Sequence, residues 1–158
     1  MGARNLPGPG RRIPNSTYRL QLGPDLSFDD VAARLDYYIA LGITDLYLSP
    51  ILAAAPGSTH GYDVVDHARI SDIMGGREAF ERLATEAHGR GLRIVVDVVP
   101  NHMAVPTPAY HNRALWSVLA EGIDSPYASW FDVDWDSSEA RILMPIRGGT
   151  SRGCRKRP

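Results

Sequence analysis

Apolar positions follow strand-like and helix-like spacings in turn along the first hundred residues. The run from Leu92 to Val99 is almost continuously apolar and rich in β-branched residues, which is typical of a strand covered on both faces. Two shorter runs, Thr17 to Leu22 and Ile43 to Leu48, predict further strands. Pro100 has no N–H to donate, so it is expected to end the third strand and to leave the next residues at the strand's carboxyl end.

Helical spacing separates these predicted strands. Apolar residues recur on one helical face between Phe28 and Ile39, and again between Phe80 and Ala87. Ser27 is placed to cap the start of the first helix, and Gly42 suits the position just after its end. Strands joined by helix-length connections must run parallel, so the predicted fold class is α/β.

Two other regions complete the predicted organisation. Residues 51–76 show little periodicity and predict a long loop, and loops of this length are usually either functional or disordered. After residue 106 aromatic residues become frequent, with a short helix predicted over 112–119 and small strands over 128–134 and 141–146. The expected divisions are a disordered lead-in at 1–15, the α/β region at 16–105, a partial inserted subdomain at 106–146 and a basic tail at 147–158.

Composition narrows the class of protein. The 158 residues, of which 44% are hydrophobic, suffice for one domain with a core, and the net charge of −1 gives no reason to expect a nucleic-acid partner. No apolar run has the length of a membrane span, and residues 1–15 lack the apolar centre of a signal peptide. The single cysteine, Cys154, cannot form an internal disulfide. These features fit a cytoplasmic enzyme fragment without nucleic-acid or membrane partners.

The last twelve residues differ from the rest of the chain. Residues 147–158 contain five basic residues and no acidic one, and they have no apolar pattern. We expect a truncated or frameshifted reading of a longer gene here. The alternative is a genuine basic tail.

Polar residues at the end of the third strand are the first candidates for chemistry. Asp97 interrupts the valine run, and a carboxylate there is costly unless a cation or several donors meet it. Asn101 and His102 follow Pro100, at the sheet edge where α/β proteins place their ligands. These side chains could hold an arginine, donate to a substrate hydroxyl or bind a metal ion. A dedicated metal site is not expected without thiolates or a carboxylate cluster, and a capped turn is the alternative.

The loop at residues 59–63 is the second candidate. Gly61 would let the backbone approach a ligand closely. The ring of Tyr62 could stack on the apolar face of a pyranose, and Asp63 could accept a hydrogen bond from its hydroxyls. A turn with a half-buried tyrosine is the alternative. The three tryptophans could form a sugar platform, although such residues usually belong to a core or an interface.

Together these segments resemble the start of the catalytic domain of the α-amylase family. Residues 97–102, Asp-Val-Val-Pro-Asn-His, and residues 61–63, Gly-Tyr-Asp, carry that resemblance. Residues 16–22, 57–67 and 125–135 are similar to one branch of the family, the malto-oligosyltrehalose synthases. The resemblance implies a (β/α)₈ TIM barrel, of which this chain would hold about three βα units and the start of an inserted subdomain.

The resemblance also implies an activity. Members of that branch convert the reducing-end α-1,4 bond of a malto-oligosaccharide into an α,α-1,1 bond, without an external cofactor. The implied substrate is thus a malto-oligosaccharide, the implied location is the cytoplasm, and the full-length protein would be a monomer.

The resemblance assigns roles to individual residues. Tyr62 would stack on the glucose at the reacting bond, Asp63 would shape that subsite, and His102 would hydrogen-bond the sugar's hydroxyls. Asp97 would brace an arginine beside the catalytic nucleophile. The implied supporting residues are Asp97, Asn101 and His60. Asn101 matches a position that helps bind calcium in some amylases, and this branch is not expected to need the ion.

The residues that perform the reaction are not expected within this chain. A retaining mechanism needs a carboxylate nucleophile and a carboxylic acid about 5 Å apart. In the α-amylase family these lie on later strands, so the nucleophile and the acid/base are expected beyond residue 158 and the chain alone should be inactive. Two alternatives remain open: another α-glucan-active member of the family, or a non-catalytic glucan-binding fragment that uses Tyr62 and the tryptophans.

Overall fold

The computed structural model describes residues 14–136 and Ile142. It divides the chain into two compact units, Met1–Arg113 and Ala114–Pro158, called here the α/β unit and the small unit. Most of the predicted lead-in and the whole basic tail lie outside the described residues. The predicted boundary between residues 105 and 106 stays a prediction.

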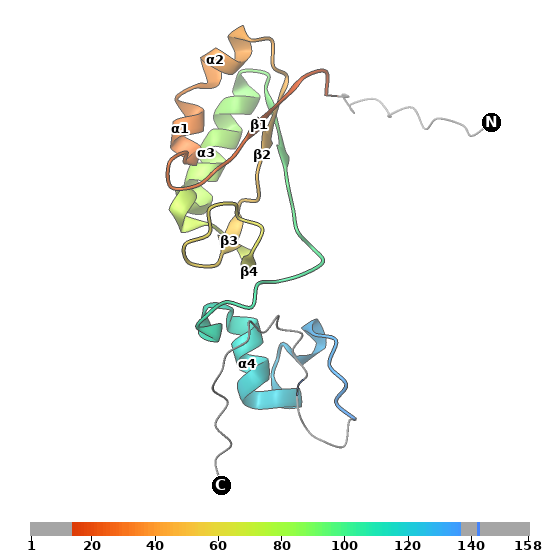
Figure 1. The fold of residues 1–158 in the computed structure, drawn as a ribbon. Helices are drawn as coiled ribbons and strands as arrows, with labels where there is room; N and C mark the ends of the chain where they lie inside the picture. Colours follow the sequence, from red (N-terminus) through yellow and green to blue (C-terminus); the bar gives the residue numbers. More distant parts are fainter. Residues whose placement is uncertain (1–13, 137–141, 143–158) are drawn as a thin grey trace, which may run out of the picture. The chain divides into compact units, whose positions relative to one another are not determined.

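Three parallel strands form the main sheet of the α/β unit. They are β1 (Thr17–Leu20), β2 (Asp45–Leu48) and β5 (Arg93–Val96), in the order β1-β2-β5 (Figure 1). The predicted parallel α/β arrangement is therefore confirmed. β5 ends three residues before the predicted Val99, although the Asp97 backbone N–H still donates to the Leu48 carbonyl at 2.9 Å.

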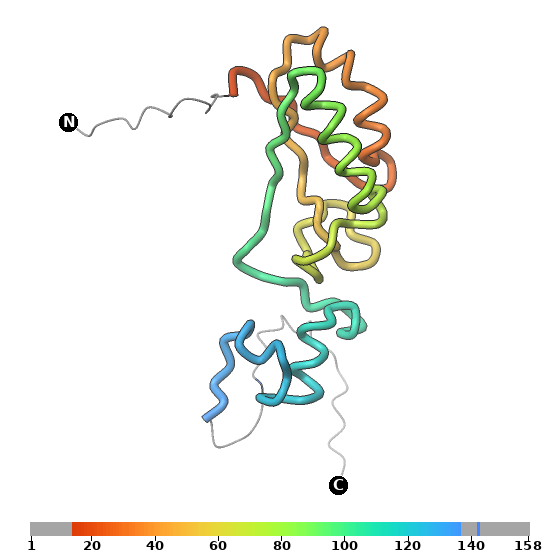
Figure 2. The backbone as a smooth tube through the Cα atoms, turned by 180° about the vertical axis from the view of Figure 1, so that it is seen from behind, coloured from red at the N-terminus to blue at the C-terminus, as the bar shows by residue number. Residues whose placement is uncertain are grey.

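Three helices lie on one side of this sheet, as Figures 1 and 2 show from opposite directions. They are α1 (Phe28–Ala32), α2 (Leu35–Ala40) and α3 (Gly76–Gly89). The strands and helices share one apolar core, whose fully buried members include Leu46, Leu48, Phe28, Val31, Leu35 and Leu83. The apolar side chains that stabilise the unit are therefore buried on the helix-facing side of the sheet.

The first helix starts at the predicted residue, but it is shorter than predicted. The Ser27 side chain accepts a hydrogen bond from the Asp30 backbone N–H at 3.2 Å, and the Asp30 carboxylate accepts one from the Ser27 N–H at 3.0 Å. This reciprocal capping box begins α1. The predicted single helix is wrong because the chain breaks at Ala33 and Arg34, where no proline or glycine signals an end.

Among the described residues of the α/β unit, no α-helix packs on the opposite face of the sheet. Val95 of β5 points to this face and is 41% exposed. The prediction that the third strand is covered on both faces is therefore wrong for these residues, because α1, α2 and α3 all pack against the other side.

A hairpin replaces the long loop predicted for residues 51–76. β3 (Leu52–Ala54) pairs antiparallel with β4 (Val64–Ile70), with two irregularities in the register, and a short 3₁₀ helix, η1 (Asp72–Met74), follows. The loop prediction is wrong. The sequence shows no sign of β4 because residues 67–69 of this strand are exposed and not apolar in alternation. An exposed strand held by backbone hydrogen bonds lacks the alternating apolar pattern that reveals a strand.

The remaining elements are short. The α/β unit ends with the 3₁₀ helix η2 (Ala109–His111). The helix α4 (Arg113–Glu121), which begins at the last residue of the α/β unit, confirms the predicted helix, and two 3₁₀ helices of the small unit follow, η3 (Gly122–Asp124) and η4 (Ala128–Trp130). The strand predicted over 128–134 is therefore wrong, and the one predicted over 141–146 lies outside the described residues except for Ile142. No helix among the described residues combines the length and the apolar content that crossing a membrane requires.

Candidate functional site

Polar side chains meet on the uncovered face of the sheet, at the carboxyl ends of its strands. The Tyr62 hydroxyl donates to Asp97 Oδ2 at 2.6 Å, and the Tyr47 hydroxyl donates to the same oxygen at 3.2 Å. Tyr47 lies on β2, Tyr62 in the β3–β4 hairpin loop, and Asp97 directly after β5. Fold topology thus gathers three segments that are far apart in the sequence. With Arg19, these residues are called the Tyr62–Asp97 cluster.

Arg19 of β1 completes the cluster. Its Nη2 donates to the Tyr62 hydroxyl oxygen at 3.2 Å, and its guanidinium carbon lies 5.7 Å from the centroid of the Tyr47 ring. The second distance is within the range of a cation–π interaction. Arg19 Nη1 also donates to Gln21 Oε1 at 3.2 Å, and Gln21 Nε2 donates to the His60 carbonyl at 3.3 Å. The polar side of β1 therefore contacts the loop that carries Tyr62.

The cluster has a defined hydrogen-bond direction. A guanidinium group can only donate, so the Tyr62 oxygen accepts from Arg19 and directs its own proton toward Asp97. The hydrogen bond to Tyr62 raises the pKa of Arg19. The hydrogen bond to the Asp97 carboxylate, with burial second, raises the pKa of Tyr47. Tyr47 therefore stays protonated, and a donor, at neutral pH.

Local turns hold the loop of residues 55–63 in place. The Ala55 N–H donates to the Asp63 carbonyl at 2.9 Å and closes the loop. Ser58 Oγ accepts from the Gly61 N–H at 3.1 Å and donates to the Asp63 carboxylate. Gly61 has a φ of +78°, and a Cβ there would lie 2.9 Å from the Pro50 carbonyl oxygen. The close approach that this glycine permits is therefore to the chain's own backbone.

The other predicted residues of this loop lie beside Tyr62. His60 Nδ1 accepts from the Tyr62 N–H at 3.0 Å, and the two ring centroids are 6.0 Å apart. The same His60 nitrogen lies 3.8 Å from Asp63 Oδ1. The structure thus brings together four of the six predicted site residues: His60, Tyr62, Asp63 and Asp97.

Asn101 and His102 lie apart from this group. Both are exposed and contact each other, with His102 Nδ1 at 3.1 Å from Asn101 Oδ1. Within the described residues, no hydrogen bond or ion pair joins His102 to the Tyr62–Asp97 cluster. Their segment is attached to β4, where His67 Nε2 lies 2.9 Å from the Val99 carbonyl oxygen. The predicted contact between His102 and a sugar stays a prediction.

Sequence reasoning did not single out Arg19, Gln21 or Tyr47. The available signal was the alternation of polar and apolar residues within the strands. Arg19 and Gln21 alternate with Leu20 and Leu22, which are buried on the helix side. Tyr47 likewise lies between two buried leucines. A polar residue between core positions marks the face of a strand that is available for a site.

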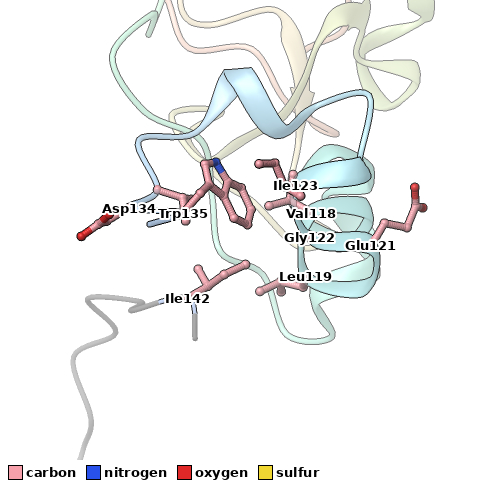
Figure 3. Close-up of a pocket in the computed structure, with 9 residues that line it drawn as sticks. Val118, Leu119, Glu121, Gly122, Ile123, Asp134, Trp135 and Ile142 are labelled. Atoms are coloured by element: carbon pink, nitrogen blue, oxygen red, sulfur yellow. The ribbon is translucent and has the colours of Figure 1, made fainter. Parts of the chain in front are cut away.

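The small unit contains a separate hollow of about 680 Å³. Apolar side chains line it, chiefly Val118, Leu119, Ile123, Trp135 and Ile142 (Figure 3). The carboxylates of Glu121 and Asp134 point away from it. Among the described residues that line it, no charged side chain points into the hollow, so it offers no charged group to sugar hydroxyls there. Nor does any ring contact join two tryptophans in the parts of the chain described here.

No group of three or more His, Cys, Asp or Glu side chains is placed to share a metal ion within residues 14–136 and 142. The Tyr62–Asp97 cluster and its loop therefore remain the candidate site.

Comparison with known proteins defines the class. The model of the α-amylase catalytic domain matches residues 25–147, which is most of this chain. The chain therefore belongs to the α-amylase family, a family of glycosidase- and transglycosylase-type enzymes.

Individual proteins of the family show which of its members this chain is similar to. The chain is 44% identical over 141 residues to a Mycobacterium tuberculosis protein that carries the name maltooligosyl trehalose synthase, covering 86% of this chain and 18% of the relative. It is 50% identical to the solved maltooligosyltrehalose synthase of Arthrobacter ramosus, with a TM-score of 0.73, covering 78% of this chain and 16% of the other. It is 40% identical over 101 residues to α-amylase 2 of Dictyoglomus thermophilum, covering 64% of this chain and 16% of that relative. The chain thus spans less than a fifth of each of these relatives.

Proposed function

We propose that this chain forms the first strands of the catalytic barrel of a malto-oligosyltrehalose synthase. The degree of identity carries the proposal. The chain is 44% identical over 141 residues to the Mycobacterium tuberculosis relative and 50% identical to the solved Arthrobacter ramosus synthase. Its identity to the Dictyoglomus thermophilum α-amylase is lower, at 40%, and extends over 101 residues.

The cluster suits a glucose-binding subsite. The Tyr62 hydroxyl is engaged by Arg19 and Asp97, so its ring is held in one orientation. A held aromatic ring offers an apolar face to the C–H groups of a pyranose. Asp63 and His60 lie beside the ring and supply polar atoms for hydroxyl groups. We assign Tyr62 to stacking, and Asp63 and His102 to the sugar's hydroxyls.

Asp97 is assigned a supporting role rather than a catalytic one. Its Oδ2 already accepts hydrogen bonds from two phenols, which makes the carboxylate a weak nucleophile. In the described residues no second carboxyl group is bonded into the cluster. Retaining glycosidase chemistry requires a pair of carboxyl groups about 5 Å apart. We therefore propose that later parts of the whole protein supply that pair and that this chain alone is inactive.

The reaction can be tested with the whole protein and maltopentaose. An isomerase breaks one α-1,4 bond and forms one α,α-1,1 bond without consuming water. Reducing ends should therefore disappear while the number of sugar molecules stays constant, as read by a reducing-end assay together with mass spectrometry. A hydrolase adds water and creates a new reducing end at each cleavage, and this second candidate is favoured by the similarity to α-amylases. Unchanged maltopentaose would contradict both.

The binding role of Tyr62 has its own test. Tyr62→Ala should weaken maltopentaose binding by roughly tenfold or more, because it removes the stacking surface. Tyr37→Ala is the matched control, since Tyr37 is an exposed tyrosine of α2. Equal effects of the two variants in isothermal titration calorimetry would reject the assignment. The cytoplasmic location and the monomeric state of the whole protein stay predictions.

A further inference from the structure

We propose that Arg19 is a positioning residue that fixes the orientation of the Tyr62 phenol. The inference rests on the proposed function for the identity of the sugar that the ring meets. The hydrogen bond between Arg19 and Tyr62 is observed in the chain and does not depend on which sugar the ring binds.

Arg19 acts through the phenol and not through a direct ion pair. In the described residues no ion pair joins Arg19 to Asp97; the Tyr62 oxygen lies between them, 3.2 Å from Arg19 Nη2 and 2.6 Å from Asp97 Oδ2. A phenol alone could accept or donate at either position. A donor-only cation on one side and a carboxylate on the other leave one direction for its proton. The Tyr62 oxygen is thereby held at two points.

The fork of the arginine side chain matters as well as its charge. Nη2 holds the Tyr62 hydroxyl while Nη1 holds Gln21, whose amide donates to the His60 carbonyl. Arg19 therefore fixes the ring directly and the loop backbone indirectly. A lysine presents a single ammonium group and cannot reproduce both contacts with the same geometry. The conservative replacement should consequently restore only part of the effect.

Arg93 provides a matched control on the same sheet. It lies on β5, two residues before Val95, and Val95 is in register with Tyr47 and Arg19. It therefore lies on the same face of the sheet as Arg19, toward the amino ends of the strands. Its side chain makes no hydrogen bond or ion pair with any described residue. Arg93→Met thus removes the same charge from the same face without touching Tyr62.

The orientation of Tyr62 can be read without any sugar. In the whole protein labelled with 3-fluorotyrosine, the ¹⁹F resonance of Tyr62 is the one missing in Tyr62→Phe. Arg19→Met should shift and average this resonance, Arg19→Lys should shift it less, and Arg93→Met should leave it in place. An Arg19→Met spectrum that matches Arg93→Met, with the thermal melting temperature unchanged in both, would overturn the proposal.

A double-mutant cycle tests the consequence for binding. Arg19→Met should weaken maltopentaose binding roughly tenfold in the wild-type background and less than twofold in the Tyr62→Phe background, because that background has no hydroxyl to hold. Equal losses in the two backgrounds would mean that Arg19 contacts the sugar directly, and would overturn the positioning role. If the wild-type protein does not bind maltopentaose, the proposed function fails, and the ¹⁹F comparison still decides the role of Arg19.

Discussion

The two faces of the β1-β2-β5 sheet are built from alternating residues of the same strands, yet they differ in almost every property. Toward the helices, Leu20, Leu46 and Leu48 are buried in a continuous apolar core. On the other side, Arg19 and Tyr47 belong to a hydrogen-bonded cluster. Strand geometry separates the two sets, because successive side chains point to opposite faces. Stability and recognition can therefore change independently, and substitutions on each face should show it.

The largest effect is expected on the helix side of the sheet. Phe28→Ala should lower the free energy of unfolding by about 3–5 kcal/mol, because it leaves a cavity between α1 and α3, where the Phe28 ring packs against Phe80. Phe28 is 0% exposed, whereas the control Tyr37→Ala removes a side chain that is 55% exposed. Urea unfolding followed by circular dichroism measures both. Similar losses in the two variants would mean that the helix-facing core does not dominate stability.

The next effect concerns the loop that carries Tyr62. Gly61→Ala should cost about 2 kcal/mol, from the positive φ and the 2.9 Å approach of its Cβ to the Pro50 oxygen. Gly57→Ala, also at positive φ but with nothing within 4 Å, should cost about 1 kcal/mol. The difference between the two melting curves isolates the steric part. Indistinguishable curves would show that the loop shifts without cost.

A smaller effect is expected at the start of α1. Ser27→Ala should cost about 1 kcal/mol, since it removes the side-chain acceptor for the Asp30 N–H. Hydrogen bonds from Ser27 lower the pKa of Asp30 in the folded chain. The stabilisation from the ionised carboxylate is thus present above the unfolded pKa of about 4 and is lost as the pH falls through the lower folded value. Acid titration of wild type against Asp30→Asn checks this, and parallel curves would contradict it.

The smallest effect is expected on the cluster side. The Asp97 carboxylate raises the pKa of Tyr47 in the folded chain. The stabilisation from the protonated phenol is therefore complete below its unfolded pKa of about 10 and is lost as the pH rises through the higher folded value. The stability difference between wild type and Tyr47→Phe should be constant from pH 7 to 9 and decrease above 10. A difference that is flat through pH 11 would argue against the Tyr47–Asp97 hydrogen bond.

Local signals explain what the sequence predicted correctly. Ser27 as the cap of the first helix, and Gly42 as the residue after the end of the predicted helical region, act within one turn of the chain and appear in the structure as expected. The three parallel strands followed from runs of apolar residues. In the candidate site, Tyr62 and Asp97 were each recognised from their own segments, and the structure joins them by a hydrogen bond that the sequence did not predict.

What the sequence did not predict depends on contacts between distant segments. Arg19 and Tyr62 are 43 positions apart, and only the order of the strands makes them neighbours. The break at Ala33 has no local signal, since apolar spacing continues across it. β4 is recognisable only through its backbone pairing with β3. Contacts of this kind can be identified only once the three-dimensional fold is known.

The order of the strands in the sheet is also the order in which a ribosome delivers them. β2 meets β1 already made, and β5 adds to the free edge of β2 without displacing a strand. Translation runs at about 5–20 residues per second, so several seconds pass between the synthesis of Leu48 and that of Val96. Helices and hairpins form in microseconds. During each round of synthesis the outer edge of β2 therefore waits, unpaired, for its partner, and it is there that a chaperone or a wrong strand would compete for the nascent chain.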